Sequence, residues 1–177
     1  TLMTDPYDSS LGISMGTQNP DIVTVSHQHP HHSHLDSLKG NPKVLQSPGE
    51  YEFANFYIVG MGTDRNHPEN TTRQINTIYV IDCEGVTLCH LGDLYNIPST
   101  REIEELGHID VLFIPAGGGC TIDPSRAAEL VNIIGPSIVI PIHFQVDGIA
   151  PSFHQQVTVR QSLLCLILQL LDDIGVE

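Results

Sequence analysis

The densest chemical signal in the chain is the run SHQHPHHSH at residues 26–34, which places five histidines in eight positions. It directly follows a short β-branched segment that predicts a buried strand. Neutral imidazole is the commonest biological ligand of zinc and its neighbours. Side chains two residues apart in an extended turn project to one side, so His27 and His29 fit one metal ion. His31 and His32 lie one turn further on and fit a second ion. The alternative interpretation of the whole run is a solvated histidine-rich loop.

Two further polar residues follow apolar strands elsewhere in the chain. Asp93 ends the segment HLGD, residues 90–93, and His143 lies in IPIHF, residues 140–144. A single-domain scaffold assembles a dispersed metal site by bringing such residues to one edge of a sheet. The combination therefore favours a metal site over a solvated loop.

The order of the predicted elements is that of an α/β protein. Short apolar or alternating segments predict strands at residues 21–26, 43–46, 51–59, 76–82, 86–90, 111–114 and 138–140. Helical patterns cover residues 98–106, 124–134 and 157–174, and the second helix is bounded by a cap at Asp123 and a stop at Gly135. The middle strands predict antiparallel hairpins and the later alternation predicts parallel βαβ units. We therefore expect one domain, residues 1–177, of mixed sheets with helices on their outer faces.

Composition limits the classes of partner. The chain has 177 residues, is 40% hydrophobic, and carries 7 Lys and Arg against 21 Asp and Glu, a formal net charge of −14. This charge repels a phosphate backbone, so we do not expect nucleic acid as a partner. The four cysteines form no Cys-x-x-Cys pair, no apolar run approaches the length of a membrane span, and the sequence begins without a signal-peptide pattern. We therefore expect a cytoplasmic protein without a membrane partner.

The chain resembles the metallo-β-lactamase superfamily, in the branch that includes the ascorbate-6-phosphate lactonases. The family motif His-x-His-x-Asp-His falls on residues 27–32, its His-x-Gly-Asp segment on 90–93 and its Pro-x-His-Phe/Tyr segment on 141–144. Residues 4–6 are similar to the family's Asp-Pro element, and residues 115–123 to its Pro-x-Gly-Gly loop. The resemblance implies an αββα sandwich that this chain enters after the first strand hairpin, and it favours a homo-oligomer.

The ligands that the resemblance implies are imidazoles and one carboxylate: His27, His29, His67, His32, His143 and Asp93. The first three would bind one ion and the next two a second ion, and the carboxylate would bridge both. His67 is the single histidine between residues 57 and 76, and an exposed loop histidine is the alternative interpretation. His90 would support the ligands from behind, or serve only as a packed strand residue.

One position departs from the family motif. His31 stands where the family has an aspartate that coordinates the second ion and orients the attacking water. An imidazole is neutral near pH 7, and its donor nitrogen lies at a different distance from the backbone than a carboxylate oxygen does. We therefore expect altered or lost activity unless His31 ligates through nitrogen or Asp36 approaches the site. Asp36 is otherwise a surface carboxylate.

These residues predict a hydrolase without a side-chain nucleophile. One or two divalent ions, zinc first and manganese second, would activate a water that attacks an ester, lactone or phosphodiester bond of a small molecule. Asp93 and His31 would occupy the catalytic positions. Arg65 and Arg73 would hold an anionic group of the substrate, or be solvated.

Two other classes of function stay open. The main alternative is a non-catalytic metal-binding or ligand-sensing protein on the same scaffold. Nucleic-acid processing is the weakest candidate, because the chain is acidic.

Two more features invite a chemical interpretation. The run Gly117-Gly118-Gly119 resembles an anion-binding loop. It lacks the Gly-Lys-Ser/Thr ending of a phosphate loop, so we prefer a tight turn at the rim of the metal site. Cys120 would be a nucleophile only with an exposed thiol and a basic neighbour, and we expect a structural thiol.

Overall fold

The computed structural model describes residues 1–65 and 74–144; the expected helix at 157–174, His67 and Arg73 lie outside these ranges. The smaller of two sheets is parallel throughout, in the order β1-β2-β3, with bounds Leu2–Thr4, Ile22–Thr24 and Lys43–Leu45. The larger sheet has the order β4-β5-β6-β7-β8-β9, with bounds Gly49–Phe53, Phe56–Asp64, Ile75–Cys83, Val86–His90, Val111–Pro115 and Ile138–Ile142.

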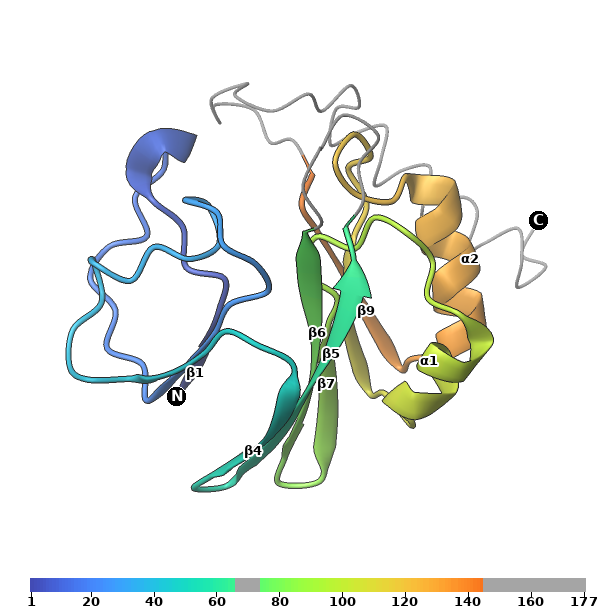
Figure 1. The fold of residues 1–177 in the computed structure, drawn as a ribbon, viewed down its shortest axis with the longest axis horizontal. Coiled ribbons are helices and arrows are strands. Elements are labelled where there is room, and N and C mark those ends of the chain that lie inside the picture. The colour runs from blue at the N-terminus through green and yellow to red at the C-terminus, as the bar shows by residue number, and fades with distance from the viewer. Residues whose placement is uncertain (66–73, 145–177) are drawn as a thin grey trace.

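The larger sheet is antiparallel from β4 to β7 and parallel from β7 to β9. Helix α1 (Thr100–Leu106) joins β7 to β8, and helix α2 (Pro124–Ile134) joins β8 to β9, as the predicted βαβ units require. Figure 1 shows this sheet between the N-terminal layer, drawn in blue, and the two helices. The prediction of mixed sheets with outer helices is confirmed. Within the described ranges, no helix is long and apolar enough to cross a membrane.

Side chains of β6 alternate between the two halves of the core. Ile78 packs in the cluster that includes Leu130 of α2, whereas Tyr79 and Ile81 pack against Ile22 of the smaller sheet. Successive residues of a strand point to opposite faces of the sheet. One central strand therefore supports both the helical layer and the smaller sheet.

The hydroxyl of Tyr79 joins the two sheets. It lies 3.2 Å from the carbonyl oxygen of Val25 and 3.0 Å from that of Leu45, so its proton is shared between two acceptors at the end of the smaller sheet. The side chain of Tyr79 is fully buried. This contact fixes the smaller sheet against β6.

The ends of the helices follow local signals. Asp123 caps α2 by accepting a hydrogen bond from the backbone nitrogen of Arg126 at 2.9 Å, and Gly135 ends the helix with a φ of 64°. Helix α1 begins at Thr100 and not at residue 98, because Ser99 and Glu102 form a capping box.

The single strand predicted at residues 51–59 is wrong. The chain instead forms the hairpin β4–β5, in which Phe53 pairs with Phe56 across a turn at residues 54–55. Ala54 adopts a φ of 51°, in the left-handed region that favours glycine. Neither glycine nor proline marks this turn, and Asn55 is its single residue of a usual turn type, so the local turn signal is weak.

Several strands end at one rim of the molecule. Strands β5, β7, β8 and β9 run in the same direction, so their carboxyl ends lie at the same edge of the larger sheet. The loops that follow β1 and β2 reach the same place, where His32 meets Asp93. This rim therefore gathers polar residues from both sheets.

Candidate metal centre

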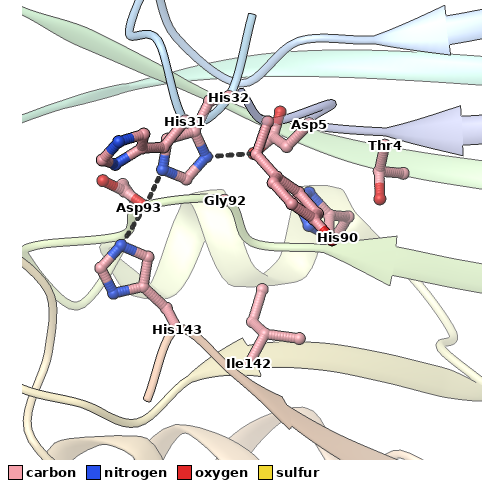
Figure 2. A pocket seen from close by; sticks show the side chains of 10 residues that line it. Thr4, Asp5, His31, His32, His90, Gly92, Asp93, Ile142 and His143 are labelled. Atoms are coloured by element: carbon pink, nitrogen blue, oxygen red, sulfur yellow. Dashed lines mark hydrogen bonds and ion pairs between the residues drawn. The ribbon is translucent and has the colours of Figure 1, made fainter. Parts of the chain in front are cut away.

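Asp93 is the centre of the site. It follows the end of β7, and its side chain is 2% exposed. Its Oδ1 lies 3.1 Å from Nε2 of His143 and 3.3 Å from Nε2 of His32 (Figure 2). Its Oδ2 lies 3.6 Å from Nε2 of His27. Three imidazoles from loops of both sheets thus surround one carboxylate.

The backbone of Asp93 is held by Asn76 of β6. Asn76 Oδ1 accepts from the backbone N–H of Asp93 at 2.9 Å, and its Nδ2 donates to the carbonyl oxygen of Leu91 at 3.0 Å. Gly92 has a φ of +57°, and a Cβ there would lie 2.5 Å from Asn76 Oδ1 and from Ser26 Cβ. Glycine is therefore required to bring Asp93 against β6 and the loop after β2.

Asp5 fixes the orientation of His32. Its carboxylate accepts from the backbone N–H of Ser26 at 2.7 Å, from the hydroxyl of Ser26 at 2.6 Å, and from Nδ1 of His32 at 2.9 Å. With Nδ1 bound, Nε2 of His32 faces Asp93. A carboxylate behind a metal-binding imidazole fixes its tautomer and ring direction in this way.

The contact between Asp5 and His32 shifts the pKa of both groups. Burial opposes ionisation of Asp5. The hydrogen bond from His32 and the electrostatic attraction of nearby imidazoles together outweigh burial, so the pKa of Asp5 falls to about 2. Burial also opposes protonation of His32, yet the same hydrogen bond raises its pKa above the ordinary value. Asp5 is therefore a carboxylate throughout the physiological range.

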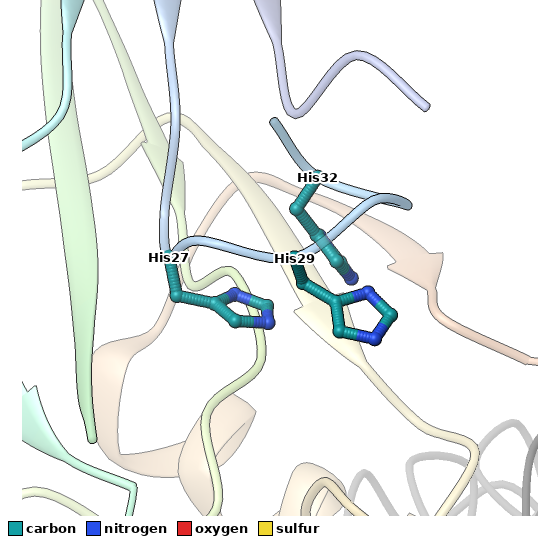
Figure 3. Close-up of side chains that lie close together, drawn as sticks. All are labelled: His27, His29 and His32. Carbon is teal, nitrogen blue, oxygen red and sulfur yellow. The ribbon is translucent and has the colours of Figure 1, made fainter. Parts of the chain in front are cut away.

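Two overlapping groups of side chains could hold a divalent ion. Among the described residues, the ligand atoms of His27, His29 and His32 all lie within 4.8 Å of one another (Figure 3). The ligand atoms of His32, Asp93 and His143 lie equally close together. Nitrogen and carboxylate oxygen donors in such groups of three are typical of zinc sites.

The bonding and protonation of these side chains fit a cation. Nε2 of His27 and Oδ1 of Asp93 are buried and have no hydrogen-bond partner in the part of the chain that the structure describes. Buried polar atoms of this kind are rare unless an ion or a water completes them. Burial lowers the pKa of His27 to about 3, and it also lowers the pKa of His29 and His143. These imidazoles are therefore unprotonated at neutral pH, the form that binds metal.

A cavity of about 350 Å³ opens at the site. The residues that line it are Thr4, Asp5, Tyr7, His31, His32, His90, Gly92, Asp93, Ile142 and His143. His90 borders the cavity, and the centroid of its ring lies 6.1 Å from that of Phe113, as expected for a packed strand residue. Its support of the ligands stays a prediction. The cavity places His32, Asp93 and His143 within reach of a small molecule.

A family model described as a beta-lactamase superfamily domain matches residues 1–143. The chain belongs to the metallo-β-lactamase superfamily. Among solved structures, a candidate zinc-dependent hydrolase of this superfamily from Thermotoga maritima is 32% identical, with a TM-score of 0.73, and the match covers 92% of this chain and 75% of that one.

Curated relatives are named metal-dependent hydrolases. One from Lysinibacillus sphaericus is 26% identical over 179 residues, which cover 81% of this chain and 77% of that protein. One from Methanosphaerula palustris is 43% identical over a shorter stretch of 65 residues, which covers 37% of this chain and 30% of that protein. These relatives support a metal-dependent hydrolase as the general class.

His31 stands where the metallo-β-lactamase motif has aspartate, and it lies at the edge of the ligand cluster. Its Nε2 is 2.7 Å from the hydroxyl of Ser10 and 3.7 Å from Oδ1 of Asp8, beside the short 3₁₀ helix η1 (Ser9–Leu11). It borders the cavity, but neither group of three ligands found in the described ranges includes it. Ligation by His31 therefore stays a prediction. Asp36 is exposed at the surface.

Arg65 is not among the described residues that line the cavity, and the interpretation of Arg65 as a solvated arginine is wrong. Its side chain is 12% exposed, and its Nη2 donates to Oδ2 of Asp93 at 2.7 Å. The residue directly follows β5, which runs parallel to β7 and therefore ends at the same rim. That position after a long strand is the signal that could have revealed it.

The glycine run lets the chain pass close to His143. A Cβ at Gly117 would overlap the carbonyl oxygen of His143, and Gly118 and Gly119 have φ angles of +69° and +67°. These contacts support the tight turn and not a phosphate loop. Burial raises the pKa of the Cys120 thiol against an opposing hydrogen bond from Arg65, so the thiol is protonated at neutral pH, as in a structural cysteine.

Proposed function

We propose that this chain is a metal-dependent hydrolase that cleaves an ester, lactone or phosphodiester bond in a small molecule. The observation that carries the proposal is the convergence of His32, Asp93 and His143 at the wall of a cavity. Metal-assisted attack by water needs no side-chain nucleophile, which is why these bond types share one chemistry. The resemblance to ascorbate-6-phosphate lactonases is the reason to include lactones.

Zinc is the first candidate for the ion and manganese the second, because the donors are imidazoles with one carboxylate. When bound, the ion supplies a Lewis acid that polarises the bond under attack and makes water acidic enough to ionise near neutral pH. Asp5 holds Nδ1 of His32, and Asn76 holds the backbone of Asp93. The ligands are thus oriented before an ion arrives, which favours a fixed geometry at the reacting bond.

The cavity favours a small substrate. A volume of about 350 Å³ is near the lower end of the range for ligand pockets. Ile142 and the ring of Tyr7 offer apolar contact, and the hydroxyl of Thr4 offers a hydrogen bond. None of the described lining residues is lysine or arginine. An anionic group of the substrate would therefore be met by the ion itself.

Metal content and turnover test the proposal together. We would measure metal per chain by elemental analysis of untagged protein purified without added metal, and hydrolysis of ester, lactone and phosphodiester model compounds. His143→Ala should lose both the ion and the turnover, because it removes one of three ligands. His108→Ala should change neither, since it removes a histidine that is 77% exposed and outside the site.

Metal-dependent turnover that disappears in His143→Ala would support the hydrolase. Unmodified protein that binds no metal would contradict it. Metal binding without turnover across the panel would instead favour the non-catalytic metal-binding or sensing function. The presence of His31 at the position of the motif aspartate is the observation that favours this non-catalytic function.

A further inference from the structure

We propose that the centre holds a single divalent ion between His32, Asp93 and His143, and that the guanidinium of Arg65 takes the place of a second ion. The inference rests on the proposed function, because it concerns the number of ions at that same site. Three features carry it: a ligand atom shared by two groups, a guanidinium held at Asp93, and a cavity on one side of the carboxylate.

The two candidate ligand groups share His32, which can serve only one of them. Nδ1 of His32 is bound to Asp5 at 2.9 Å, so Nε2 is the nitrogen that faces the other ligands. The unprotonated nitrogen of an imidazole has one lone pair and therefore binds one ion. When His32 completes the group with Asp93 and His143, the other group keeps, among the described residues, only His27 and His29. His67, the further ligand that the resemblance implies there, lies outside the described ranges. Two ligands are one fewer than the three protein ligands of a catalytic zinc site.

Arg65 occupies the oxygen that would complete a second site. A bridging carboxylate must offer one oxygen to each ion, but Oδ2 of Asp93 accepts a hydrogen bond from Nη2 of Arg65 at 2.7 Å. The same oxygen faces Nε2 of His27 at 3.6 Å. A guanidinium is charged at every physiological pH. It therefore neutralises Asp93 on this side and repels a cation from the pair His27 and His29.

The guanidinium is anchored at this position. Nη1 of Arg65 donates to Oε1 of Gln74 at 3.1 Å, and the backbone N–H of Arg65 donates to the carbonyl oxygen of Gln74 at 2.9 Å. These bonds extend the pairing of β5 with β6 by one residue beyond Asp64. Because the backbone and the tip of the side chain are both held, the charge has a fixed place in the site.

The cavity lies on the other side of Asp93. His32 and His143 border it, whereas His27, His29 and Arg65 are not among the described residues that line it. Oδ1 of Asp93 is a buried oxygen that makes no hydrogen bond in the described ranges, and Nε2 of His143 and Nε2 of His32 lie 3.1 and 3.3 Å from it. A single ion bound at Oδ1 would meet the substrate, and Arg65 would stand behind it.

Equilibrium dialysis against zinc, followed by elemental analysis, tests the number of ions. The unmodified protein and Arg65→Lys should each bind one ion per chain. Arg65→Met keeps much of the length of the side chain but removes its charge, and should bind two. Arg101→Met is the matched control, because Arg101 is 87% exposed and outside the site, and it should bind one. Circular dichroism would show that each variant is folded.

Two ions in the unmodified protein, or one ion in Arg65→Met with unchanged zinc affinity, would overturn this inference and leave the proposed function standing. No ion in any form would contradict both. If Arg65→Met fails to fold, the double variant His27→Ala/His29→Ala gives an independent test. It should still bind one ion with unchanged affinity, because neither histidine is a ligand of the single ion, and loss of that ion would overturn the inference.

Discussion

Asp5 shows how far the centre depends on a residue behind the ligands. Asp5→Asn removes the negative charge of the carboxylate that accepts hydrogen bonds from Nδ1 of His32 and from the hydroxyl of Ser26. We expect zinc affinity to fall about 10- to 100-fold, as when the support of other metal-binding imidazoles is removed. Competition with a chromophoric chelator would measure it. Asp82→Asn, on the exposed side of β6, controls for the loss of one negative charge; equal affinities in the two variants would show that Asp5 does not position His32.

The acid dependence of stability should also involve Asp5. Its pKa of about 2 in the folded protein lies below the ordinary value of 3.8, so unfolding takes up a proton as the pH falls. The stabilisation, about 2 kcal/mol, is complete above about pH 4 and is lost as the pH falls towards about 2. In urea titrations of metal-free protein, the free energy of unfolding of the unmodified protein should fall towards that of Asp5→Asn as the pH is lowered across this window. A constant difference between the two would contradict the assignment.

Single residues differ in how well the sequence predicts them. His32, Asp93 and His143 could be found, because each follows a strand and is of a ligand type. The support of His32 by Asp5 joins residues 27 positions apart, and no local pattern encodes that distance. Arg65 is harder still, since its burial depends on the direction in which β5 runs relative to β7.

At the scale of elements, the turn after β7 is the point where a small change should disturb the site. Gly92→Ala places a Cβ 2.5 Å from Asn76 Oδ1 at a left-handed φ of +57°, and should displace Asp93. We expect more than about 1 kcal/mol of lost stability and weaker zinc binding. Gly85→Ala is the matched control, because its φ is +82° but no atom lies within 4 Å of the added Cβ.

Unfolding in urea and zinc titration would separate the two effects. Gly85→Ala should show the cost of backbone strain alone, with zinc affinity unchanged. If Gly92→Ala binds zinc as tightly as Gly85→Ala does, the close approach of Asp93 to Asn76 is not what places the ligand.

Elements differ in how closely local signals predict their bounds. Helix α2 lies between Asp123 and Gly135, as its cap and stop residues predict. The hairpin β4–β5 escapes local reasoning because its turn contains Ala54 in a conformation that alanine rarely adopts. In the smaller sheet, β2 and β3 fall within the strands predicted at residues 21–26 and 43–46, whereas β1 has no predicted counterpart, because its three residues are too few to show a period.

At the scale of the whole molecule, the contact between the sheets should depend on the hydroxyl of Tyr79. Tyr79→Phe keeps the buried ring but removes the proton shared by the carbonyl oxygens of Val25 and Leu45. The free energy of unfolding in urea should fall by about 1 kcal/mol. Tyr57→Phe, at a side chain that is 46% exposed, should leave it nearly unchanged. Equal stabilities for the two variants would show that this hydroxyl does not join the sheets.

The candidate ligands come from both sheets: His32 follows β2, whereas Asp93 and His143 follow β7 and β9. A bound ion would therefore act as a removable cross-link between the two halves of the core. A ligand that binds only the native state stabilises it by mass action, by about 2.7 kcal/mol when its free concentration is about a hundred times its dissociation constant. The melting temperature should rise with the logarithm of free zinc and fall when a chelator is added. The thermal stability of the protein would then depend on the free zinc concentration of its surroundings as well as on its sequence, and the supply of metal would limit the temperature that the folded protein tolerates.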